Sequence, residues 1–192
     1  DVLGQAKLGL SLNLKSEYGQ RIIKELISKS DVLIENFAPG VMDRLGLDWE
    51  TIRKINPNLV MVSASGTGQF GPTAKYAAYG TLLQGYTGFA GLNGYYDQNE
   101  TMGIAWTDPL CGMLLAYAIA SALYKRQIVN EGFRVDFAMV EAQLSTMPES
   151  LIEKQVSGEK LHRRGNFDSY FYPNNVYRMQ GEDNWISISI SN

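Results

Sequence analysis

Asp108 and its neighbours are the strongest candidates for a chemical role in this 192-residue sequence. The pair Asp108-Pro109 stands directly before the apolar stretch 109–124. Asp is a preferred N-cap and Pro is favoured at the first helical position, so helix capping alone explains the pair. A carboxylate at a helix N-terminus is also held ionised, and an ionised, fixed Asp can attack a thioester to form an acyl anhydride. Local chemistry leaves both interpretations open.

Segment 66–71 is a second candidate, because its glycines have the G-x-G-x-x-G spacing of a dinucleotide-binding loop. The residues after Gly71 do not open a strongly amphipathic helix whose N-terminus could hold a pyrophosphate. The acidic residue expected for the ribose is also missing at its usual spacing. We therefore interpret the segment as a tight loop at the carboxyl end of a parallel strand, with nicotinamide binding as the minor alternative.

Strands and helices alternate along most of the chain, which favours an α/β fold built from βαβ units. Segment 59–64 is apolar on both faces, as in the strands of a parallel sheet. The long apolar helix falls short of the ~20 apolar residues that cross a bilayer, so we expect it to be buried in a core. The expected strands are 31–34, 59–64 and 134–139, and the expected helices are 16–30 with Ser16 as N-cap, 39–44, 48–54, 79–90, 108–127 and 140–156.

The composition changes near residue 158, after which aromatic residues, Asn and Gly accumulate. Segments 175–179 and 184–190 alternate as a β-hairpin would. We place a domain boundary there. The first residue is Asp1 rather than Met, and the last predicted strand has no partner after it, so we expect the chain to be a piece of a longer protein.

Composition and charge exclude several classes of function. The net charge of -3 supplies no basic field for nucleic acid. Cys111 is the single cysteine and His162 the single histidine, so an internal disulfide and a zinc site are excluded by count. We expect no metal, no membrane partner and a reducing, cytoplasmic setting.

The sequence resembles the family III CoA-transferases, the group of formyl-CoA transferase and the carnitine CoA-transferases, from about residue 8 to residue 192. The strings that carry the resemblance are DVLIENFAPGVMDRLGLDWETIRKINPNLVMVSASGTGQFGP, YGTLLQGYTGFAGLNG, WTDPLCGMLLAYAIASALYKR and RVDFAMVEAQ. The resemblance implies an incomplete Rossmann-like large domain with a parallel sheet and a linker helix over residues 1–157. Residues 158–192 would begin a smaller α+β domain.

The resemblance also implies an activity, the transfer of CoA from an acyl-CoA to a carboxylic acid. Asp108 matches the catalytic nucleophile of the family, which passes through an aspartyl anhydride and an aspartyl-CoA thioester. Tyr79 stands where the related racemases have a histidine, and a tyrosine with its ordinary pKa near ~10 suits racemisation poorly. Transferases that resemble formyl-CoA transferase have a tyrosine at this position, and the resemblance implies that Tyr79 hydrogen-bonds the acyl or acceptor carboxylate. Racemase activity is the less favoured alternative, and a non-catalytic CoA-binding fragment is another.

Four further residues match positions that lie along the CoA in the family. They are Lys15, Asn36, Phe37 and Arg44. Cations suit the phosphates of CoA and an aromatic face suits its adenine. Full-length members of the family are interlocked homodimers, and a chain of this length lacks the segment that closes the ring. We therefore expect a homodimer for the parent protein, but neither interlocking nor activity from these residues alone.

Overall fold

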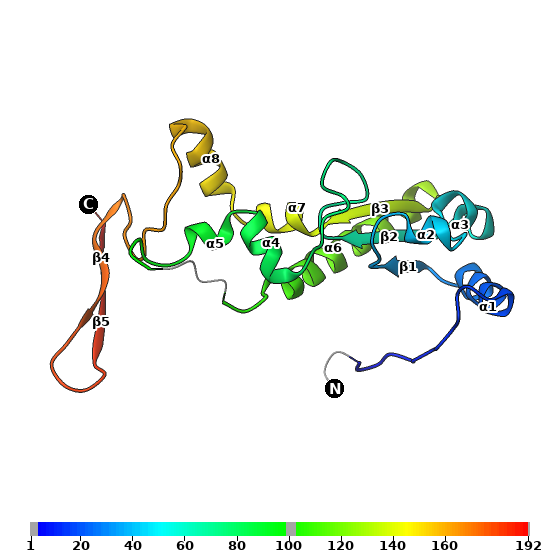
Figure 1. Cartoon of the computed structure of the whole chain (residues 1–192), viewed down its shortest axis with the longest axis horizontal. Helices are drawn as coiled ribbons and strands as arrows, with labels where there is room; N and C mark the ends of the chain where they lie inside the picture. The colour runs from blue at the N-terminus through cyan, green and yellow to red at the C-terminus, as the bar shows by residue number, and fades with distance from the viewer. Residues whose placement is uncertain (1–3, 99–102, 192) are drawn as a thin grey trace. The chain divides into compact units, whose positions relative to one another are not determined.

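The computed structural model describes residues 4–98 and 103–191, and it has a mixed α/β fold (Figure 1). The chain divides into two compact units. The first contains residues 1–76 and 113–138, and the second contains residues 77–112 and 139–192. The long helix α6 (Thr107–Val129) begins in the second unit and continues into the first.

The first unit is built on a three-stranded parallel sheet. Its strands are β1 (Val32–Glu35), β2 (Val60–Ser65) and β3 (Phe133–Ala138), in the order β1-β2-β3. Every residue of the central strand β2 is buried, as its continuous apolar sequence predicts. The α/β class and the parallel sheet expected from the sequence are therefore confirmed.

Besides the part of α6 from residue 113 onward, this unit has three helices in its described residues: α1 (Glu17–Ser28), α2 (Val41–Arg44) and α3 (Trp49–Ile55). Both predicted caps are confirmed, because Ser16 accepts from the amide of Gly19 and Asp48 from the amide of Thr51. The hydrogen bonds from Thr51 hold the pKa of the Asp48 carboxyl below its ordinary value. The buried core of the unit consists of Ile27, Met42, Leu47, Ile52, Leu59 and Met61.

Besides the start of α6, the described part of the second unit has the helices α4 (Gly80–Tyr86), α5 (Phe89–Leu92), α7 (Met139–Leu144) and α8 (Pro148–Ser157). The predictions of one helix over residues 79–90 and one over 140–156 are wrong, because α4 and α5 are separate helices and so are α7 and α8. Gly88 takes the left-handed conformation at φ 82° between α4 and α5. Pro148 starts α8, because proline lacks the amide hydrogen and restricts the residue before it.

The predicted hairpin is confirmed in the same unit. Strands β4 (Phe171–Arg178) and β5 (Trp185–Ser191) pair antiparallel. Gly165 approaches the Tyr95 ring so closely that a Cβ would lie 2.3 Å from a ring carbon. Glycine at position 165 is therefore explained by packing together with its left-handed backbone, which has a φ of 58°. The division of the protein into domains at residue 158 stays a prediction.

Helix α6 is mostly exposed, contrary to the expectation of a buried core helix. Only Thr107 and Cys111 of its 23 residues are buried, and Tyr117 and Tyr124 expose 75% and 68% of their surface. By length and composition alone α6 could also span a membrane, a test that core helices of soluble proteins pass as well.

Candidate functional site

Asp108 lies in the first turn of α6 rather than at its N-cap. The helix begins at Thr107, and the first i+4 hydrogen bond runs from the Leu110 amide to the Trp106 carbonyl, at 3.1 Å. Within the described residues no donor or cation contacts the Asp108 carboxylate, and the side chain is exposed. The interpretation of Asp108 as a helix cap is therefore wrong, because capping requires a hydrogen bond from a first-turn amide to the carboxylate.

The start of α4 lies directly beside this carboxylate. A Cβ built on Gly80 would lie 2.8 Å from Oδ2 and 2.9 Å from Oδ1 of Asp108. Tyr79 is the residue before Gly80, with an extended backbone and a side chain that is 69% exposed. The structure thus brings together the chain segments of the two predicted catalytic residues.

Buried contacts fix the segment that leads into α6. The Gln84 amide of α4 donates to the Ile104 carbonyl at 2.8 Å, and the Phe89 and Trp106 rings lie 4.9 Å apart. The Thr107 hydroxyl donates to the Gln143 side-chain oxygen at 3.2 Å. Gln84, Thr107 and Gln143 are fully buried. These three residues were not predicted from the sequence. The only sign of buried polar contacts in it is that two glutamines stand within predicted helices that are largely apolar.

Cys111 lies one turn after Asp108 and is buried, with its thiol directed at the Met139 carbonyl at 3.6 Å. Burial disfavours the thiolate, and the negative charge of Asp108 disfavours it further. Together they raise the pKa of the Cys111 thiol to about 11. The thiol is therefore protonated at neutral pH and has no role as a nucleophile there.

The reactivity of Cys111 should report this electrostatic coupling. Because its pKa is raised from 9.0 to about 11, the thiolate fraction at pH 8 should be about 100-fold below that of the unfolded protein. Alkylation by iodoacetamide should then accelerate about tenfold per pH unit up to about pH 11. The change Asp108→Asn should shift this profile to lower pH. A plateau near pH 9 in the native protein would contradict the assigned burial and charge.

The predicted CoA-binding residues lie in the first unit. Asn36 and Phe37 follow the end of β1, Arg44 ends α2, and Lys15 precedes α1. All four are exposed. The Asn36 amide donates to the Ala64 carbonyl at 2.5 Å and so joins the ends of β1 and β2, a structural role that the sequence did not reveal.

The glycine-rich loop 66–71 follows β2 and does not open a helix. Gly68 and Gly71 have φ values of 90° and 100°, which glycine adopts without strain. The backbone amide of Gln69 donates to both Asp136 carboxylate oxygens, at 3.2 and 3.1 Å. One backbone amide of the loop is therefore already hydrogen-bonded to a carboxylate of β3. A dinucleotide phosphate would bind to such amides, so this contact supports the interpretation that the loop is not a dinucleotide site.

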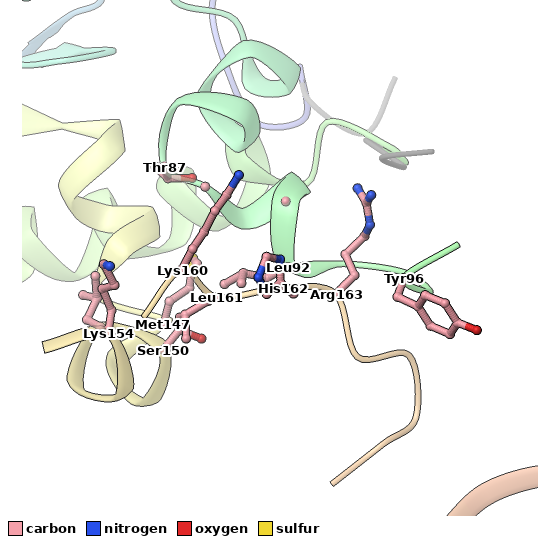
Figure 2. Close-up of a pocket in the computed structure, with 13 residues that line it drawn as sticks. Thr87, Leu92, Tyr96, Met147, Ser150, Lys154, Lys160, Leu161, His162 and Arg163 are labelled. Atoms are coloured by element: carbon pink, nitrogen blue, oxygen red, sulfur yellow. The ribbon is translucent and has the colours of Figure 1, made fainter. Parts of the chain in front are cut away.

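A cavity of about 470 Å³ lies elsewhere in the second unit, between the α4–α5 region, α8 and the segment after it (Figure 2). Lys154, Lys160, His162 and Arg163 line it together with Leu92, Leu161 and other residues. The Lys154 ammonium donates to the carbonyls of Gly158 and Glu159, so it closes the end of α8. Neither Asp108 nor Tyr79 lines this cavity.

Comparison with known proteins assigns the chain to a family. Residues 2–192 match CoA-transferase family III. The chain belongs to this family. The resemblance seen in the sequence is therefore confirmed. The matched residues include Asp108 and the start of α4 that lies beside it.

Several proteins named as CoA-transferases are similar to the chain. Acetyl-CoA:oxalate CoA-transferase of Acetobacter aceti is 38% identical over 93% of this chain and 46% of its own length. Succinyl-CoA–D-citramalate CoA-transferase of Chloroflexus aurantiacus is 33% identical over 92% of this chain and 44% of its own. The chain thus spans about half the length of these relatives.

The fold also matches solved structures of the family. The crystal structure of a CAIB/BAIF family protein from Brucella suis superposes with a TM-score of 0.86 at 30% identity. The match covers 97% of this chain and 49% of that protein. The arrangement of the elements described here is therefore that of about half of a CAIB/BAIF protein.

Proposed function

We propose that the complete protein containing this chain transfers CoA from an acyl-CoA donor to a carboxylic acid acceptor, with Asp108 as the covalent nucleophile. The observation that carries the proposal is the state of the Asp108 side chain. It is an exposed carboxylate without a hydrogen bond from the described residues, on a helix start that buried contacts hold in place. A carboxylate that neither caps nor pairs keeps its lone pairs available for attack.

The chemistry proceeds through covalent intermediates on Asp108. Its carboxylate attacks the thioester carbonyl, the C–S bond breaks, and a mixed anhydride and CoA thiolate form. The thiolate attacks the aspartyl carbonyl, which releases the donor acid as a carboxylate and leaves an aspartyl-CoA thioester. The acceptor carboxylate then attacks that thioester to give a new anhydride and thiolate. Attack of the thiolate on the acceptor carbonyl yields the new acyl-CoA and restores Asp108.

Other residues have supporting roles in this proposal. Tyr79 hydrogen-bonds the acyl or acceptor carboxylate from its position before Gly80. Lys15, Asn36, Phe37 and Arg44 bind CoA, and their exposure leaves them accessible to it. The reaction needs no metal, because a carboxylate nucleophile and a thiolate leaving group are sufficient for acyl transfer. The parent protein is proposed to be a cytoplasmic homodimer.

Small carboxylic acids are the proposed substrates. The relatives are named for oxalate, D-citramalate, succinate and glutarate as acids and for acetyl-CoA, formyl-CoA and succinyl-CoA as donors. These compounds define the panel in which the donor and acceptor of this protein should be sought.

The test is covalent capture on Asp108. The complete protein is incubated with each donor of the panel, treated with hydroxylamine or analysed directly, and digested for peptide mass spectrometry. We expect the mass of CoA, or of the hydroxamate, on the peptide that contains Asp108. If no donor gives an adduct there while CoA still binds, the proposal fails and a CoA-binding protein without transferase chemistry is the better interpretation.

A further inference from the structure

The buried residues of α6 form one stripe, and this stripe contacts α7. Thr107 and Cys111 stand four residues apart, so they lie on one face of α6. The Thr107 hydroxyl donates to Oε1 of Gln143 at 3.2 Å, and the Cys111 thiol is directed at the Met139 carbonyl at 3.6 Å. Met139 and Gln143 are also four residues apart, in α7. One turn of α6 therefore lies along one turn of α7.

This seam, formed by Thr107, Cys111, Met139 and Gln143, determines how the start of α6 is rotated about its axis. Successive residues of an α-helix are about 100° apart around the axis. Asp108 directly follows Thr107, so the direction of its side chain changes whenever the seam turns. The thiol of Cys111 is a weak hydrogen-bond donor. The Thr107–Gln143 bond is therefore the strongly directional contact of the seam.

Stability alone does not explain a glutamine at position 143. Its side chain is fully buried, and its Nε2 atom has no acceptor among the described residues. A buried amide with an unpaired donor costs more free energy than a single neutral hydrogen bond returns. An apolar side chain of the same size would fill this place without that cost. The amide thus fixes a direction at the expense of stability.

We propose that Gln143 is a positioning residue that acts through Thr107 to set the rotation of α6, and so the location of the Asp108 carboxylate. The inference rests on the proposed function, in which that carboxylate attacks the thioester. The attacking oxygen and the thioester carbon must be aligned at close range, so a displacement of about 1 Å can cost about 10²-fold in rate. Gln143 is fully buried and exerts this effect without touching the substrate.

The test replaces both members of the bond by apolar side chains of similar shape, with Thr107→Val and Gln143→Leu together in the complete protein. This double variant loses the directional contact and also the unpaired amide, so its Tm should be unchanged or raised. Its kcat and its rate of adduct formation on Asp108 should nevertheless fall at least about tenfold. The KM for acyl-CoA should be unchanged, because the proposed CoA-binding residues lie in the other unit.

Single changes separate the bond from the loss of a side chain. Thr107→Ser keeps the hydroxyl donor and should keep the kcat of the unchanged protein, whereas Thr107→Val alone should lower it. Ser121→Ala is the matched control on α6, because the Ser121 hydroxyl donates to the Tyr117 carbonyl within the helix, and it should leave kcat unchanged. An unchanged kcat in the double variant would overturn the proposal. A lowered Tm there would also overturn it, since the pair would then stabilise the fold.

Alkylation of Cys111 tests the seam without using catalysis. The thiol is buried in the seam, so iodoacetamide reaches it only when the two helices separate locally. We expect the double variant to react several-fold faster than the unchanged protein at pH 8. An equal rate would overturn the proposal, because the bond would then not hold the helices together. If the unchanged protein forms no adduct with any donor, the proposed function fails separately, and alkylation still decides whether Gln143 holds α6.

Discussion

The change Asp108→Asn in the complete protein is expected to reduce the rate of CoA transfer by at least about 10³-fold. Asparagine has nearly the shape of aspartate but cannot form the mixed anhydride, because a neutral amide is a poor nucleophile. The measurement is kcat with a donor and acceptor from the panel of small acids, together with mass spectrometry of the peptide that contains Asp108. The adduct should disappear along with the activity.

Two controls separate loss of chemistry from loss of structure. The Asp108 carboxylate is exposed and unpaired within the described residues, so Asp108→Asn should change the free energy of unfolding by less than about 0.5 kcal/mol. Asp97 is an exposed carboxylate of the same unit, and Asp97→Asn should keep full activity. A variant Asp108→Asn that retains more than a tenth of the rate would show that another group performs the attack.

The second large effect is expected on stability, from Gly132→Ala. Gly132 is buried, and its amide donates to the Pro57 carbonyl at 2.9 Å just before β3. A Cβ there would lie 2.3 Å from the Leu59 carbonyl oxygen and 2.7 Å from that of Pro57. Backbone atoms cannot move aside as a flexible side chain can, so the entry into β2 would have to shift. We expect a loss of about 3 kcal/mol or more in the free energy of unfolding.

Urea unfolding of the complete protein, followed by circular dichroism, measures this loss. Gly9→Ala is the matched control, because a Cβ at Gly9 meets nothing within 4 Å and should leave the transition midpoint nearly unchanged. Equal midpoints for Gly132→Ala and Gly9→Ala would mean that the β2–β3 junction is less tightly packed than the structure indicates.

The local elements were predictable where the signals lie within a few residues. The apolar run of β2, the Ser16 and Asp48 caps and the β4–β5 hairpin each follow from short-range patterns, and the structure confirms them. The two helices that were predicted too long share one physical origin. Helical periodicity runs through Gly88 and Pro148, but the backbone breaks at both, because one takes a left-handed conformation and the other lacks an amide hydrogen.

The α/β class, the family and the identity of the candidate nucleophile could be predicted from residue types in a fixed order along the chain. The surroundings of Asp108 could not be predicted in this way and are seen only in the folded structure. The contacts of its surroundings join residues far apart in the chain, Gly80 with Asp108 and Thr107 with Gln143. Such pairings arise when helices pack against one another, and no local pattern encodes which bare Cα will face which carboxylate.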